Sequence, residues 1–146
     1  MKYYSGMFAL TQYANPDEHS RGIGDRVDEF YEKRDEYLKE SDESKLGTYG
    51  IFETDIVPYG GTIMCASHER VYLDFIVSKD FDTLKDLYDY AYNDLNVLHN
   101  IFNACSYFNL YSKGVVKFLN WQFGSNFRSY LMYKGNDDLL KYIMPD

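Results

Sequence analysis

The stretch DRVDEFYEKRDEYLKE, residues 25–40, carries the clearest structural signal in the chain. At the 100° step of an α-helix, its apolar side chains fall within one stripe about 120° wide. These side chains are Val27, Phe30, Tyr31, Tyr37 and Leu38. Arg34 lies inside the stripe, where we expect it to pair or to extend its head group to water. The pattern predicts one amphipathic helix over residues 25–40 with an aromatic inner face.

Acidic side chains occupy the opposite face of this predicted helix. They are Asp28, Glu29, Glu32, Asp35, Glu36 and Glu40. Lys33 and Lys39 offset only part of their mutual repulsion. Such a face can meet a basic groove on another protein, and charge complementarity would speed that encounter. These six residues are therefore the predicted partner-binding surface, with an ordinary solvated helix face as the alternative.

The composition is that of a folded, acidic chain. Its 146 residues suit one domain, and its 16 Tyr, 10 Phe and 1 Trp exceed the ring content of a disordered chain. The 15 Lys and Arg against 23 Asp and Glu give a net charge of -8. We expect a single domain over residues 1–146, and general coating of nucleic acid is disfavoured because phosphate repels negative charge.

Several site types have no sequence support. The only cysteines, Cys65 and Cys105, lack the close spacing of a zinc or disulfide framework, and the 3 His form no metal motif. No apolar run approaches the roughly 20 residues of a membrane span, and the N-terminal sequence lacks the signal-peptide pattern. The sequence therefore predicts a cytoplasmic protein with no cofactor, no metal and no membrane partner.

Strand signals flank residues 25–40, and helix signals follow them. Residues Tyr3 to Gln12 predict a strand, and Tyr49 to Phe52 predict a short one. Ile63 to Ser78 fits either a strand by propensity or a buried helix by periodicity. Further helices are indicated from Asp82, from Asp94, from Tyr111 and from Phe127, with a short turn from Asp137. The fold class is α+β: a small N-terminal β element and a predominantly helical C-terminal two-thirds, in a single domain.

Charge is polarised along the chain. Residues 1–94 carry a net charge of -10, whereas residues 95–136 contain four basic residues and no acid. Ten aromatic rings accompany these bases between residues 96 and 135, a combination that can bind single-stranded nucleic acid by stacking. The candidate contacts for that hypothesis are Lys113, Lys117 and Arg128. The alternative is that the rings, which recur at helical spacing, form the core.

One compact polar set lies in the otherwise apolar stretch from Ile63 to Ser78. It consists of His68, Arg70 and Asp74, the candidate catalytic residues of a small hydrolase or nuclease. On a helix, Arg70 and Asp74 form an ion pair at i, i+4, and His68 lies well around the helix from them. The alternative is a structural salt bridge with a core histidine.

Three blocks of the chain resemble a group of small proteins from low-GC Gram-positive bacteria and their mobile elements. The blocks are KYYSGMFAL (residues 2–10), SDESKLGTYGI (residues 41–51) and ASHERVYLD (residues 66–74). In the group, an Ala-Asn-His-Ile-Arg run in the third block precedes a helix, which favours the helical alternative after Ile63. The group also carries Gly-Asp-Trp-His after the first strand, where this chain has Asn15 to Arg21 with only His19. The resemblance implies no particular activity.

These observations lead to one leading hypothesis about function. A small acidic chain with no catalytic motif and many tyrosines is typical of a protein that acts by binding another protein. We expect an inhibitor or antitoxin-like factor of phage or mobile-element conflict, whose carboxylates either imitate the spacing of nucleic-acid phosphates or simply complement Lys and Arg on the target. The alternatives are the hydrolase or nuclease and the single-stranded nucleic-acid binder. The oligomeric state is not predicted.

Overall fold

The computed structural model describes residues 1–11, 27–55, 61–91 and 95–143, without the side chains of 11, 27, 28, 87–91 and 137. The chain divides into two compact units, Met1–Phe75 and Ile76–Asp146. We call these the N-terminal unit and the C-terminal unit. The division falls within helix α3, which runs from His68 to Ser78.

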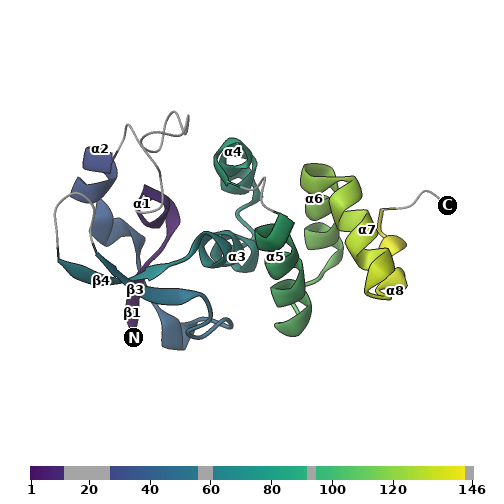
Figure 1. Cartoon of the computed structure of the whole chain (residues 1–146), viewed down its shortest axis with the longest axis horizontal. Coiled ribbons are helices and arrows are strands. Elements are labelled where there is room, and N and C mark those ends of the chain that lie inside the picture. The colour runs from purple at the N-terminus through teal and green to yellow at the C-terminus, as the bar shows by residue number, and fades with distance from the viewer. Residues whose placement is uncertain (12–26, 56–60, 92–94, 144–146) are drawn as a thin grey trace. The chain divides into compact units, whose positions relative to one another are not determined.

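A mixed four-stranded sheet forms the centre of the N-terminal unit (Figure 1). Its strands are β1 (Lys2–Tyr4), β2 (Leu38–Glu40), β3 (Ile51–Asp55) and β4 (Thr62–Ala66). In the sheet they follow the order β2-β1-β4-β3. Strand β1 is antiparallel to β2 and parallel to β4, whereas β3 and β4 are antiparallel. The first strand of the chain is therefore central, and β2 and β3 are the edges.

Short helices accompany the sheet in the described part of the N-terminal unit. They are α1 (Gly6–Thr11), α2 (Val27–Glu32), and the 3-10 helices η2 (Arg34–Tyr37) and η3 (Ser41–Glu43). Helix α1 contacts α2, η2 and strand β4. The buried apolar side chains of this unit include Tyr3, Phe8, Leu10, Phe30, Leu46, Val71, Tyr72 and Leu73. The core is thus built from β1, α1, α2, β4, α3 and the loop around Leu46.

The strand predicted over Tyr3–Gln12 is wrong beyond Tyr4. The backbone turns at Gly6, which has φ +62°, and helix α1 follows. A positive φ is accessible to glycine and strained for other residues, so this position ends the strand. Phe8 is fully buried on the helix, so the apolar run that indicated a strand instead forms the inner face of α1.

The helix predicted over residues 25–40 is also wrong as a single element. Helix α2 ends at Glu32, η2 occupies the middle, and the last three residues form strand β2. At the break, Arg34 Nη1 donates to the carbonyl of Tyr31 at 2.9 Å, which satisfies one of the carbonyls left free at a helix end. Pairing with β1, with Tyr4 opposite Leu38, holds the last residues extended. Tertiary pairing therefore overrides a strong helical periodicity.

The ambiguous stretch after Ile63 contains both elements that its sequence indicated. It begins in strand β4 and continues as helix α3 from His68. Ser67 separates the two, and its Oγ accepts a hydrogen bond from the backbone N–H of Arg70 at 3.2 Å. A serine at this position accepts from a free N–H group at the start of the helix. This N-cap determines that β4 ends and α3 begins here.

Five helices make up the rest of the C-terminal unit. They are α4 (Phe81–Ala91), α5 (Leu95–Tyr107), α6 (Lys113–Phe123), α7 (Ser125–Tyr133) and α8 (Asp137–Leu140). Helix α7 contacts α5, α6 and α8, and α6 also contacts α4. All five were predicted, so the α+β class with a helical C-terminal part is confirmed. None of the helices in the described ranges is both long enough and apolar enough to cross a membrane.

Aromatic packing fills the C-terminal unit. The fully buried ring of Phe102 on α5 lies 5.7 Å from Phe123, 5.1 Å from Phe127 and 5.2 Å from Tyr130, measured between centroids. Such edge-to-face and tilted contacts add about 0.5–1.5 kcal/mol per pair beyond area burial. Several rings of the basic aromatic stretch therefore serve the core, which was the alternative interpretation.

The turn before β3 generates the first prediction. Gly50 has φ +70°, and a Cβ there would lie 2.9 Å from the Cβ of Arg70 and 3.1 Å from Ser67 Oγ. Gly47 has φ +54° with nothing within 4 Å, so it is a matched control for backbone strain. Both alanine variants should lose about 1–3 kcal/mol from positive φ, and Gly50→Ala about 1 kcal/mol or more beyond Gly47→Ala. Urea denaturation measures the difference, and equal losses would contradict the steric account.

Candidate functional site

The predicted pair Arg70 and Asp74 forms on helix α3. Arg70 Nε donates to Asp74 Oδ1 at 2.9 Å, and the side chains are 0% and 7% exposed. A buried ion pair is tolerated only where further hydrogen bonds offset the loss of hydration. The partners of this pair therefore decide what it can do.

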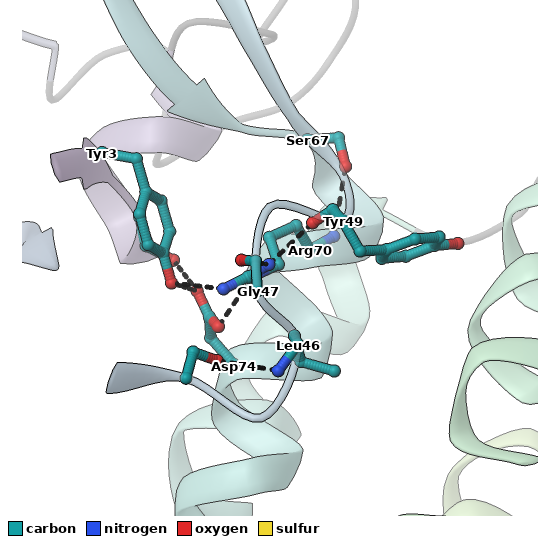
Figure 2. A network of polar contacts seen from close by, with 9 residues as sticks. Tyr3, Leu46, Gly47, Tyr49, Ser67, Arg70 and Asp74 are labelled. Carbon is teal, nitrogen blue, oxygen red and sulfur yellow. Dashed lines mark hydrogen bonds and ion pairs between the residues drawn. The ribbon is translucent and has the colours of Figure 1, made fainter. Parts of the chain in front are cut away.

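Arg70 is enclosed by acceptors from two other parts of the N-terminal unit (Figure 2). Its Nη1 donates to the carbonyl oxygens of Gly47 and Tyr49, both at 2.7 Å, and its Nη2 to the hydroxyl of Tyr3 at 2.8 Å. The guanidinium also lies 4.8 Å from the centroid of the Tyr3 ring. One side chain thus joins α3 to strand β1 and to the loop that leads into β3.

Asp74 is held just as fully. Its Oδ2 accepts hydrogen bonds from the hydroxyls of Tyr3 at 2.9 Å and Ser5 at 2.6 Å. Burial, and then the charge of Asp74, raise the pKa of Tyr3 to about 12, so the phenol stays protonated and keeps donating. With three donors on its two oxygens, Asp74 is placed as a structural anion rather than as a free general base.

His68 stands apart from this network. It is the first residue of α3 and is half-buried, and burial lowers the pKa of its imidazole. Within the described ranges, the side chains of Arg70 and Asp74 form hydrogen bonds with each other and with Tyr3, Ser5, Gly47 and Tyr49, and not with His68. The structure therefore joins two of the three predicted catalytic residues and leaves the histidine outside the pair.

The six predicted partner-binding acids do not share one helix face. Glu29 and Glu32 lie on α2, Asp35 and Glu36 on η2, and Glu40 on β2, and the side chain of Asp28 lies outside the described residues. Lys33 lies 3.8 Å from Glu29, and the N-terminal ammonium donates to Glu40, whose pKa it lowers. Glu32, Asp35 and Glu36 are exposed and have no ion-pair partner among the described residues. We call these three the acidic patch.

The predicted nucleic-acid contacts lie on two helices of the C-terminal unit. Lys113 and Lys117 are exposed on α6, and Arg128 is exposed on α7. Arg128 Nη1 donates to Asn120 Oδ1 at 2.9 Å, which directs this guanidinium toward α6. Asn120 follows Lys113 and Lys117 at helical spacing, so the three bases lie on or beside one face of α6.

A groove between α5 and α7 is the hollow that sequence reasoning missed. Its volume is about 410 Å³. From α5 it is lined by Leu95, His99 and Asn103. From α7 and the residue after it, it is lined by Asn126, Ser129, Tyr130, Tyr133 and Lys134. We call this hollow the α5–α7 groove.

One signal in the sequence points to this groove. Leu95, His99 and Asn103 recur every four residues, so they follow one exposed line on α5, beside the buried stripe of Leu98 and Phe102. Such a line is ordinarily read as a solvated helix face. Only the packing of α7 beside α5 turns it into the wall of a hollow.

Comparison of the chain with protein-family models, with curated proteins and with solved structures finds no match. Across the described ranges, no three His, Cys, Asp or Glu side chains are grouped in a way that would hold a metal ion. The functional interpretation therefore depends on the geometry and charge of the chain itself.

The buried pair generates the second prediction. Replacing Arg70 by Met leaves Asp74 as a buried charge without its cation, which should destabilise the N-terminal unit by about 3–5 kcal/mol. Lys33 and Glu29 have the same i, i+4 spacing at an exposed position, so Lys33→Met should cost less than about 1 kcal/mol. Denaturant unfolding followed by circular dichroism compares the two. Similar losses would show that burial of the Arg70 pair matters little.

His68 generates the third prediction. Because burial lowers the folded-state pKa below the ordinary 6.5, the unfolded chain binds the proton more tightly. Stability contributed by neutral His68 is therefore present above pH 6.5 and is lost as the pH falls from there through the lowered pKa. The unfolding free energy of the wild type should decrease more steeply across this window than that of His68→Gln. Parallel pH profiles for the two proteins would contradict the assignment.

Proposed function

We propose that the chain acts by binding another protein, which meets the N-terminal unit with a basic surface. The observation that carries the proposal is the acidic patch, three exposed carboxylates that the described part of the fold does not neutralise. Complementary charge accelerates encounter and helps to select the partner. The patch replaces the continuous helix face expected from the sequence, since α2 and η2 present these side chains in succession.

The charge balance of the unit supports this proposal. Residues 1–75 contain 15 acidic and 8 basic residues, a net charge of -7, whereas residues 76–146 contain 8 and 7, a net charge of -1. One of the bases, Arg70, is buried and neutralised by Asp74, so it adds no positive charge to the surface. A field of one sign over one unit steers oppositely charged partners toward it.

Other exposed acids lie elsewhere in the N-terminal unit. Asp42 and Glu43 are exposed on η3, where the N-terminal ammonium lies 3.6 Å from Asp42, and Glu53 and Asp55 are exposed on the edge strand β3. They add to the negative field of the unit. Each exposed ion pair is individually weak. Such a surface therefore contributes to binding through the sum of several pairs and through faster association.

The partner class that fits this chemistry is a protein whose basic surface normally meets phosphate. Carboxylates spaced along a surface can occupy the positions of nucleic-acid phosphates, since both are oxygen anions that accept from Arg and Lys. An inhibitor or antitoxin-like role in the conflict between phages or mobile elements and their hosts is the biological setting that we propose. The resemblance of three sequence blocks to mobile-element proteins supports that setting.

Charge reversal of the patch is the fourth prediction. The variant Glu32→Lys, Asp35→Lys, Glu36→Lys should fold, because all three side chains are exposed, and should weaken partner binding at least about tenfold. The partner is first captured on the immobilised chain from the native host, identified by mass spectrometry and purified. Its association rate and affinity are then measured at low and high salt.

The matched control is Asp82→Lys, Asp86→Lys, Asp138→Lys, which changes the net charge equally with exposed residues of the C-terminal unit. It should leave the affinity within about twofold of the wild type, because it leaves the acidic patch unchanged. Equal weakening by both variants would show that binding depends on the net charge of the chain and not on the acidic patch. Unchanged binding after reversal of the patch would remove the proposed surface.

A further inference from the structure

The α5–α7 groove offers hydrogen-bond donors that the described protein does not use. The hydroxyl of Tyr130 donates to Asn103 Oδ1 at 2.6 Å, which leaves the two N–H donors of the Asn103 amide for a ligand. The side chains of Asn126 and Ser129 have no hydrogen-bond partner among the described residues. Lys134 adds a full positive charge, and its described contact is with a ring rather than a carboxylate. The groove is therefore rich in donors.

The described lining of the α5–α7 groove has no carboxylate to pair with Lys134 or to accept from the amides. The described lining contains no Asp or Glu, and residues 95–136 contain none in the sequence. Charge-assisted hydrogen bonds from ammonium and amide donors are strongest to oxyanions such as phosphate. The ligand that suits the groove is therefore an anion with several acceptors.

Aromatic surface lies beside the donors. Tyr133 is 85% exposed, and Lys134 Nζ lies 5.7 Å from the centroid of its ring. Leu95, 54% exposed, contributes apolar surface from the opposite helix. An exposed ring next to a cation can stack a flat group while the cation meets its charge. A hollow of about 410 Å³ lies within the range of sites for small organic ligands.

We propose that the α5–α7 groove binds a nucleotide. The base stacks on Tyr133, its acceptor groups receive hydrogen bonds from Asn103 and Asn126, and the phosphate meets Lys134. A free mononucleotide and one nucleotide of a single strand share this chemistry, so either source can supply the ligand. The site is independent of the acidic patch, which belongs to the other unit.

This site differs from the nucleic-acid surface predicted from the sequence. Lys113, Lys117 and Arg128 do not line the groove, and Arg128 is bonded to Asn120. An acidic peptide would satisfy the lysine and the amides but would leave the exposed ring of Tyr133 without a flat partner. The ring therefore favours a nucleotide and makes the peptide an outcome that the experiment separates.

The test uses the full chain at low salt. Calorimetry with the four ribonucleoside 5′-monophosphates tests the free ligand, and fluorescence anisotropy with labelled oligo-dA and oligo-dT tests the strand. We expect saturable binding in at least one arm. Tyr133→Ala should weaken it about tenfold, the effect of losing one stacked base. Lys134→Glu should weaken it at least as much, with a smaller dependence on salt.

Lys117→Glu is the matched control, because it makes the same charge change at an exposed position outside the groove. It should leave binding within about twofold of the wild type. Monophosphate binding identifies a free nucleotide as a ligand, and oligonucleotide binding alone identifies a strand. The proposal is overturned if neither arm binds, if Lys117→Glu weakens binding as much as Lys134→Glu, or if an oligoglutamate peptide binds as tightly as the nucleotides.

Discussion

The buried guanidinium of Arg70 is the interaction on which the N-terminal unit depends. Moving a cation out of water is costly, and here the charge of Asp74, two backbone carbonyls and the Tyr3 hydroxyl together offset that cost. These partners come from β1, from the loop before β3 and from α3, which lie far apart in the sequence. The network therefore fixes the path of the chain around the sheet, and its polar groups are committed to that structural task.

The buried charges of the N-terminal unit neutralise each other, whereas its surface charges do not. Because Arg70 and Asp74 neutralise each other inside, the negative charge of the N-terminal unit remains on exposed residues such as Glu32, Asp35 and Glu36. Helices α5, α6 and α7 of the other unit contain no acidic residue, and the four bases of residues 95–136 give this part a positive charge. One chain can thus present surfaces suited to a basic protein and to an anionic ligand.

Helices of the C-terminal unit were predictable because their signal is local. The stripe of Leu98, Ile101, Phe102 and Cys105 on α5 follows from spacing within one helix, and all four side chains are buried. The N-terminal errors have the opposite origin. Strand β2 is set by its register with β1, more than thirty residues away, and that pairing prevailed over the helical periodicity of residues 25–40. Local patterns cannot report a partner that distant.

The candidate sites also combine features that local spacing predicts with features that only tertiary contacts create. The pairing of Arg70 with Asp74 was predictable from their i, i+4 spacing, but its role was not, because Tyr3, Ser5 and the carbonyl oxygens of Gly47 and Tyr49 reach it only through the tertiary fold. The α5–α7 groove is the converse case. Its amides and hydroxyls resemble any solvated helix surface in sequence, and they acquire meaning only when two helices bring them to one hollow. A run of carboxylates is recognised in the sequence itself, whereas a donor-rich groove with a single lysine is recognised only once the fold has brought its two helices together.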